Sequence, residues 1–202
     1  MQKPATTQYP VIDAVRERWS PRAFADKPVE REKLGALFEA ARWAASAFNE
    51  QPWRFIVASK HDDPAEYDKA LGCLVEANQT WAKAAPVLVL TACSTAFKKN
   101  GNDNRVAMHD LGQAAAHLTL QATALGLATH QMAGVDLDKV REAYNVPDGF
   151  EPQTAIAIGY PGEPDQLPEG WARDAETAPR DRMPFGEFVF SKTFGQASGL
   201  LG

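Results

Sequence analysis

Residues 45–58 read Ala-Ser-Ala-Phe-Asn-Glu-Gln-Pro-Trp-Arg-Phe-Ile-Val-Ala. Within them, the spacing of the apolar residues changes from that of a helix to that of a strand. Before this stretch, apolar residues recur at helical spacing from 34 to 41, which predicts an amphipathic helix that begins after Pro28 and fades near Ser46. Residues 53–58 alternate and are rich in aromatic and β-branched side chains, which predicts a strand. Ser46, Asn49 and Gln51 therefore lie at a helix-to-strand junction. They are either a helix cap with a turn or part of a binding site.

Upstream of that helix, residues 18–22 read Arg-Trp-Ser-Pro-Arg. A short helix is predicted for residues 9–18, and it ends here because Pro21 pushes Ser20 out of the α region. Arginine stays charged at any working pH and binds a phosphate through two parallel hydrogen bonds. On its own, the pattern is weak and is more often a solvated surface stretch than a phosphate site.

The rest of the chain alternates helices and strands irregularly and has no internal repeat or linker, so we expect one domain over residues 1–202. The irregular order predicts an α+β fold and not a doubly wound sheet. The predicted elements are a helix at 64–84, a buried strand at 86–91, a loop at 94–104, a helix at 105–125 that stops at Gly126, a strand at 127–132, a helix from 136 through 144, a strand at 154–160, an irregular Pro-rich stretch at 161–184 and a last strand at 187–190.

The helix at 105–125 carries a stripe of leucines and small alanines. Such small side chains allow another helix to approach closely, so the stripe fits either core packing or the centre of a dimer interface. Its members are Leu111, Ala115, Leu118, Ala122 and Leu125.

Composition excludes several classes of function. A formal charge of −5 argues against a nucleic-acid or anionic-membrane partner. Cys73 and Cys93 are too far apart for a redox or zinc motif and are expected to be buried thiols. His109 and His117 are eight residues apart, so we expect no metal site there. No apolar leader and no apolar run of about 20 residues is present, so the protein is expected to be cytoplasmic and not to contact a membrane.

Several nucleotide and hydrolase motifs are missing from the sequence. No GxGxxG follows a predicted strand, which argues against a separate dinucleotide-binding domain. The absence of GxxxxGK[ST] argues against phosphoryl transfer on a P-loop, and the absence of GxSxG argues against an α/β-hydrolase.

Taken together, RxSxR, an amphipathic helix and then SxxNxQPWxF resemble the nitroreductase superfamily of FMN enzymes. Later segments also resemble this family. Among them are residues 78–81 before a buried strand, Gly134 after a short strand, and Arg180-Asp181-Arg182 towards the C-terminus. The resemblance spans the chain from about residue 11 to residue 190. It implies a central mixed, mainly antiparallel sheet flanked by helices, in an obligate homodimer with the flavin at the interface.

The resemblance also implies roles for individual residues. Arg18 and Ser20, next to Trp19, would hold the FMN phosphate and ribityl chain together with Arg180 and Arg182. Arg22 would lie near the pyrimidine end of the flavin, where its positive charge tunes the flavin's potential. Asn78 would bind the pyrimidine edge, and backbone N–H groups around Ala133 and Gly134 would face the flavin. Ser46, Asn49 and Gln51 would come from the other subunit.

The implied activity is that of an FMN-dependent NAD(P)H oxidoreductase. In a ping-pong reaction, a nicotinamide would deliver hydride to the flavin, and a nitroaromatic, quinone or free flavin would then take its place as acceptor. No side chain need act as a catalytic group. The physiological acceptor and the choice between NADH and NADPH stay open, because the sequence reveals no residue that reads the ribose.

Three alternatives also stay open. The first is an enzyme of the same fold with other chemistry, such as reductive dehalogenation or flavin breakdown. The second is a non-enzymatic FMN-binding or redox-sensing protein. The third is an α+β domain that binds a different phosphate ester. The chain departs from many relatives at Ala45, where they have proline, and at Ala133, where some have an acidic residue. Its loop at 94–104 lacks a long helical insertion, which leaves the acceptor pocket undefined.

Overall fold

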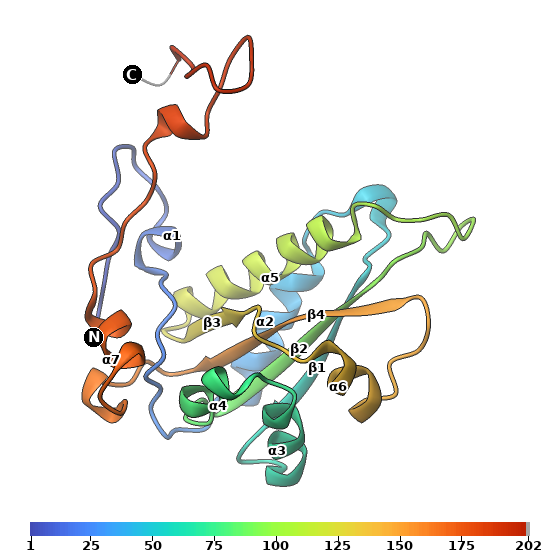
Figure 1. The fold of residues 1–202 in the computed structure, drawn as a ribbon, viewed down its shortest axis with the longest axis vertical. Helices are drawn as coiled ribbons and strands as arrows, with labels where there is room; N and C mark the ends of the chain where they lie inside the picture. The colour runs from blue at the N-terminus through green and yellow to red at the C-terminus, as the bar shows by residue number, and fades with distance from the viewer. Residues whose placement is uncertain (201–202) are drawn as a thin grey trace.

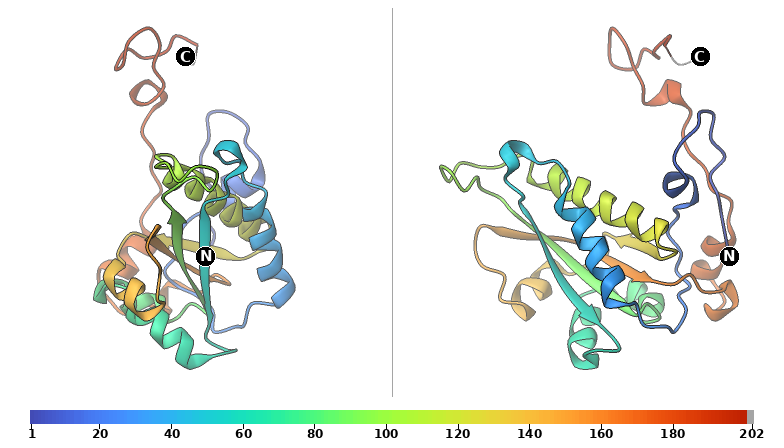
Figure 2. Two further views of the ribbon diagram at one scale, coloured as in Figure 1. Left: turned by 90° about the vertical axis from the view of Figure 1, so that its right-hand side faces the viewer. Right: turned by 180° about the vertical axis from the view of Figure 1, so that it is seen from behind.

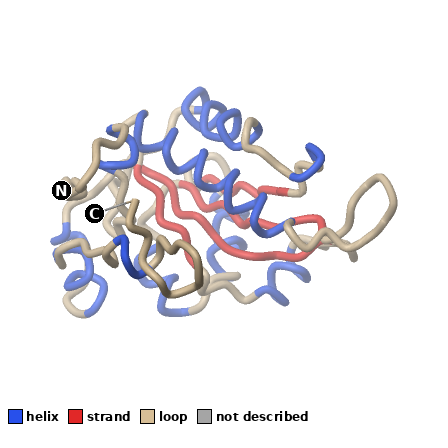
Figure 3. The backbone as a smooth tube through the Cα atoms, turned by 90° about the horizontal axis from the view of Figure 1, so that it is seen from above, coloured by secondary structure: helices blue, strands red, loops and turns tan. Residues whose placement is uncertain are grey.

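The computed structural model describes residues 1–200, and its centre is a four-stranded sheet in the order β1-β2-β4-β3 (Figure 3). Each neighbouring pair of strands in this sheet is antiparallel. The strands are β1 (Trp53–Ser59), β2 (Val87–Ser94), β3 (Ala128–Met132) and β4 (Phe150–Gly159). The expected α+β class is confirmed, but within residues 1–200 the sheet is antiparallel throughout and not mixed as expected.

Helices cover both faces of the sheet (Figures 1 and 2). One face carries α2 (Arg31–Arg42) and α5 (Ala107–Ala124), and the other carries α3 (Pro64–Gly72), α4 (Glu76–Ala82) and α6 (Leu137–Ala143). Strand β2 contributes to both cores because successive side chains point to opposite faces. Val87 and Val89 pack in the core under α2 and α5, whereas Leu88 and Leu90 pack in the core under α3 and α4.

Most predicted elements are present. The predicted helix before residue 46 is α2, and the predicted strands at 53–58, 86–91 and 127–132 are β1, β2 and β3. Helix α5 ends before Gly126, which has a φ of 74°, and the Asp136 side chain caps α6 as expected. The first helix, α1 (Asp13–Glu17), is shorter than predicted, and β4 begins earlier than predicted. Both cysteines are free and buried, as expected.

The prediction of one helix over residues 64–84 is wrong, because the chain forms α3 and α4 with a break between them. At the break, the backbone N–H of Val75 donates to the carbonyl of Gly134, and the N–H of Asp136 donates to the carbonyl of Cys73. These long-range bonds replace helical ones. Local periodicity could not reveal them, since the partner segment lies about 60 residues downstream.

Two predictions near the C-terminus are also wrong. The stretch expected to be irregular contains a short 3₁₀ turn, η2 (Pro164–Gln166), and a helix, α7 (Trp171–Thr177). The expected strand at 187–190 is instead a 3₁₀ turn, η3 (Phe185–Glu187), followed by one isolated bridge between Phe190 and Ala197. Figure 1 shows the chain after α7 running alongside α1 and ending away from the sheet, so no neighbouring strand is available to it there.

The stripe on α5 is part of this chain's own core. Leu111, Ala115, Leu118 and Ala122 are buried against α2 and the sheet. The outward face of α5 is different. Met108 is 63% exposed there, and Gly112 and Ala116 follow it at intervals of four residues and are also exposed. Small residues thus line the free face of the helix as well as the buried one.

Candidate cofactor-binding site

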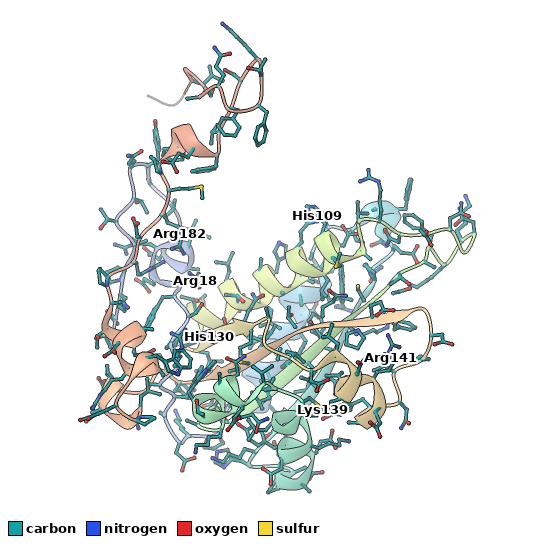
Figure 4. The ribbon with its side chains drawn as sticks, viewed as in Figure 1. Arg18, His109, His130, Lys139, Arg141 and Arg182 are labelled. Carbon is teal, nitrogen blue, oxygen red and sulfur yellow. The ribbon has the colours of Figure 1, made fainter. Side chains whose placement is uncertain are left out.

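Arg18 lies at the end of α1 in a group of three guanidinium groups that approach each other. Burial lowers the pKa of Arg18, and the charges of Arg180 and Arg182 lower it further. Figure 4 shows Arg18 and Arg182 close together beside α1. Arg18 Nη1 donates to Ser20 Oγ over 3.1 Å. Like charges that are gathered and partly buried repel each other, so this arrangement favours an anion as ligand.

The guanidinium groups of the predicted site form no ion pairs. Within residues 1–200, no ion pair includes Arg18, Arg22, Arg180 or Arg182. Other arginines of this chain, such as Arg16 and Arg42, do form ion pairs. No ion pair within residues 1–200 therefore neutralises the guanidinium groups at the end of α1.

Two of these arginines are partly engaged by the backbone. Arg180 Nη1 donates to the carbonyls of Lys3 and Arg16 and so fastens the N-terminal segment to α1. Arg182 Nη1 donates to the carbonyl of Asp181. Beside Arg18 and Trp19 lies a cavity of about 310 Å³, which is lined by residues 1–4, the end of α1 and the segment after α5.

Arg22 lies between two tryptophans. Its guanidinium carbon is 5.1 Å from the ring centroid of Trp171 and 5.9 Å from that of Trp81. Its Nε is buried and has no hydrogen-bond partner within residues 1–200. An orphaned buried donor is uncommon in folded proteins and calls for an acceptor from water or from a ligand.

Asn78 and Gly134 connect Arg22 to the turn after β3. Trp81 and Asn78 are one turn apart on α4, and Asn78 Nδ2 donates to the carbonyl of Gly134 over 3.1 Å. A Cβ at Gly134 would lie 2.4 Å from Asn78 Nδ2, so only glycine allows this approach. Ala133 is exposed next to it. The structure thus brings Arg22, Asn78 and the Ala133–Gly134 backbone into one connected region.

His130 lies on β3, near enough to Arg18 and Arg22 to feel the charges of both, and Figure 4 shows it on the sheet side of Arg18. Its ring is tilted by 43° against Trp81 with 4.5 Å between centroids, and its Nδ1 is 3.0 Å from the carbonyl of Pro21. Burial lowers the pKa of His130 to about 4, and the charges of Arg22 and Arg18 act in the same direction. The ring is therefore neutral near pH 7. Because a carbonyl only accepts, its proton lies on Nδ1.

The loop with Ser46, Asn49 and Gln51 has an unusual backbone. Phe48, Asn49 and Gln51 have φ values of 54°, 57° and 50°, in the left-handed region that residues other than glycine rarely adopt. Ser46 Oγ accepts the N–H of Gln51 over 3.1 Å. Asn49 and Phe48 are exposed, and Phe48 is 93% accessible. Strain of this kind is concentrated at functional sites.

Two buried carboxylates brace this loop. Asp110, in the first turn of α5, accepts the N–H of Ala47 over 3.0 Å, and Glu50 accepts the N–H of Lys98 over 2.8 Å. The Lys98 ammonium in turn donates to the carbonyl of Glu50 over 2.9 Å. These contacts hold the strained loop in place and anchor it to the loop at 94–104.

Within one chain, this loop does not meet the arginines. It contacts the beginning of α5, whereas the cavity beside Arg18 is lined by Thr123 and by residues after the end of α5. The 18 residues of that helix separate the two regions by about 27 Å. In Figure 4, His109 marks the far end of α5 from Arg18 and Arg182. Ser46, Asn49 and Gln51 therefore form a separate group.

Sequence reasoning missed several residues that shape the site. Trp171 and Glu176 lie on a helix that the surrounding prolines concealed. His130 had no distinguishing sequence signal, and Asp110 and Glu50 resemble ordinary surface carboxylates in the sequence. The sequence does allow a helix at residues 171–177, because this segment contains no proline and only its flanks are rich in proline. Within residues 1–200, no cluster of three or more potential metal ligands is found, and no helix has the length and apolarity to cross a membrane.

The model of the nitroreductase family matches residues 15–160. A Xanthomonas oryzae protein, provisionally named as an NADH dehydrogenase/NAD(P)H nitroreductase, is 31% identical over 160 residues, which cover 70% of this chain and 80% of that protein.

Two solved structures show the same fold. A crystal structure of an FMN-containing oxidoreductase has a TM-score of 0.87 and 34% identity and covers 94% of this chain and 95% of its own. A nitroreductase family protein from Clostridium difficile has a TM-score of 0.68 and 28% identity and covers 89% of this chain and 96% of its own.

Proposed function

Because the chain belongs to the nitroreductase family, we propose that it is an FMN-dependent NAD(P)H oxidoreductase that reduces a small electron-poor acceptor. The main support for the proposal is the convergence of Arg18, Arg180 and Arg182, none of which forms an ion pair within residues 1–200. The FMN-containing oxidoreductase that resembles this chain over 94% of its length supports the choice of cofactor.

The residues present fit FMN at both of its ends. Arg18 and Ser20, with Arg180 and Arg182, offer charge-assisted hydrogen bonds to a phosphate. The guanidinium group of Arg22, the Asn78 amide and the backbone at Ala133 and Gly134 offer donors to a heterocycle with several acceptor atoms. The distribution suits a long ligand that is anionic at one end and planar and polar at the other.

The protein's own part in the reaction is binding, orientation and electrostatics. When bound, FMN supplies the two-electron chemistry, by which NAD(P)H, a proton and the oxidised acceptor give NAD(P)⁺ and the reduced acceptor. Arg18 and its neighbours fix the phosphate, and Arg22 places positive charge at the pyrimidine end. No side chain is assigned as a nucleophile or as a proton donor.

A second copy of the chain would complete the site. If two α5 helices pack antiparallel about a two-fold axis near Ala116, the beginning of one helix lies beside the end of the other. Ser46, Asn49 and Gln51 of one subunit then approach Arg18 and Arg22 of its partner. Exposed Gly112 and Ala116 would let the two helices come close, and the exposed Met108 would be covered.

The function is tested with the purified, desalted chain. We expect it to bind added FMN and to acquire the visible absorption of a flavoprotein. Without oxygen, NADH or NADPH should then bleach that absorption, and a quinone or nitroaromatic should restore it. A chain that never takes up FMN would contradict the proposal. A flavoprotein that neither nicotinamide bleaches would point to the non-enzymatic alternative.

A further inference from the structure

Helix α7 touches the segment that carries Arg22, although some 150 residues separate them in the sequence. In Figure 1, α7 lies beside the segment that leads from α1 to α2. The helix lies beyond the residues that the family model matches, which end at 160. Its contacts with Arg22 therefore add to what the family motif specifies.

Glu176 fixes the backbone at Arg22. It is 1% exposed, and its two carboxylate oxygens accept the N–H groups of Arg22 over 2.7 Å and of Ala23 over 3.2 Å. A fully buried carboxylate is costly unless its oxygens are hydrogen-bonded, and these two bonds satisfy it. The path of the chain at Arg22 is therefore set by a residue of α7.

Trp171, at the beginning of the same helix, fixes the guanidinium group. The Arg22 guanidinium is in contact with the rings of Trp171 and Trp81, and Trp81 is fully buried. Contact between a cation and an aromatic face is attractive and restricts the guanidinium plane. Because rings do not accept conventional hydrogen bonds, this contact leaves the terminal N–H groups of Arg22 available, whereas its Nε is buried.

We infer that α7 is a positioning element for Arg22, in which Glu176 sets the backbone and Trp171 sets the guanidinium so that its donors face the pyrimidine edge of FMN. This inference rests on the proposed function. A fixed positive charge there favours reduced FMN over oxidised FMN, because reduction adds negative charge to that end of the ring. Trp171 and Glu176 thus act on the cofactor through Arg22.

The test replaces Trp171, because its side chain is 53% exposed and its loss should leave the fold intact. We expect Trp171→Ala to weaken the binding of oxidised FMN about fivefold. We expect the same substitution to weaken the binding of reduced FMN about ten times more than that of oxidised FMN, which lowers the midpoint potential by about 30 mV. Trp171→Phe should restore most of both properties. The readouts are a fluorescence titration with FMN and equilibration of the bound flavin with a redox dye.

Trp43→Ala is the matched control. Trp43 is 75% exposed and also lies over an arginine, Arg42, at 5.8 Å, but it is at the end of α2 and outside the site. It should change neither readout. If Trp171→Ala keeps the wild-type affinity and potential, the positioning role is wrong while the proposed function stands. If the wild-type chain binds no FMN, the proposed function fails, and this inference fails with it.

Discussion

Arg18 is the residue on which the anion site depends most directly. It is half-buried, donates to Ser20, and has Arg180 and Arg182 as neighbours. We expect Arg18→Ala to weaken FMN binding by about 1.5–3 kcal/mol, the magnitude of a hydrogen bond to a charged group. Arg16→Ala is the control, because Arg16 lies two residues away but pairs with Asp13 and Glu17. A titration of each variant with FMN checks the prediction, and equal affinities would contradict the role of Arg18.

His130 predicts a pH dependence of stability. Its folded-state pKa of about 4 is below the ordinary value of 6.5, so between these values the unfolded chain binds a proton that the folded chain does not. The free energy of unfolding therefore falls as the pH drops from 6.5 to 4, by about 3 kcal/mol from this residue. Chemical denaturation across this range should be less pH-dependent in His130→Asn, which keeps an N–H donor at the δ position.

At the level of single residues, the sequence predicted the polar groups that could bind a ligand but not those that hold them. Arg18, Ser20 and Arg22 are recognisable because their spacing and chemistry match a motif. Glu176 and His130 are not, because their roles arise from contacts across more than 100 residues. Local patterns carry no information on which distant backbone atoms a carboxylate or an imidazole will meet.

Among the secondary-structure elements, the break between α3 and α4 could not be predicted for the same reason. The segment between them bonds to residues 134–136, and this contact depends on the absence of a side chain at Gly134. In Gly134→Ala the new Cβ would lie 2.4 Å from Asn78 Nδ2 and 2.7 Å from Val75 Cγ2. We expect overpacking to lower the free energy of unfolding by about 1–3 kcal/mol. The displacement of Asn78 should also weaken FMN binding.

Gly35→Ala is the control for that prediction. Gly35 lies in α2, and a Cβ there meets nothing within 4 Å. The substitution should raise the free energy of unfolding by about 1 kcal/mol, because alanine is the better helix former. Denaturation curves of the two variants should move in opposite directions. A Gly134→Ala variant as stable as the wild type would show that α4 can move away at no cost.

For the whole molecule, the geometry of a single chain leaves the candidate site divided. The strained loop at one end of α5 and the arginines at the other are each well braced, yet about 27 Å of helix separates them. The order of secondary structure predicted an α+β fold, but the location of the second half of the site could come only from the family resemblance. Hydrophobic periodicity identifies buried faces of one chain and cannot tell which exposed face a second copy covers.

The last prediction tests that arrangement. Ala116 is exposed near the middle of α5, where the proposed two-fold axis passes. Ala116→Glu would place two like charges against each other at a closely packed helix contact, so we expect the dimer to dissociate. FMN affinity should fall with it, since each flavin then lacks the loop of the partner. Ala65→Glu, at an exposed position on α3, should affect neither property. Light scattering and FMN titration of both variants are the measurements. A monomeric Ala116→Glu variant with full FMN affinity would mean that one chain alone forms the complete site, and the loop at 46–51 would then need another explanation for its strain.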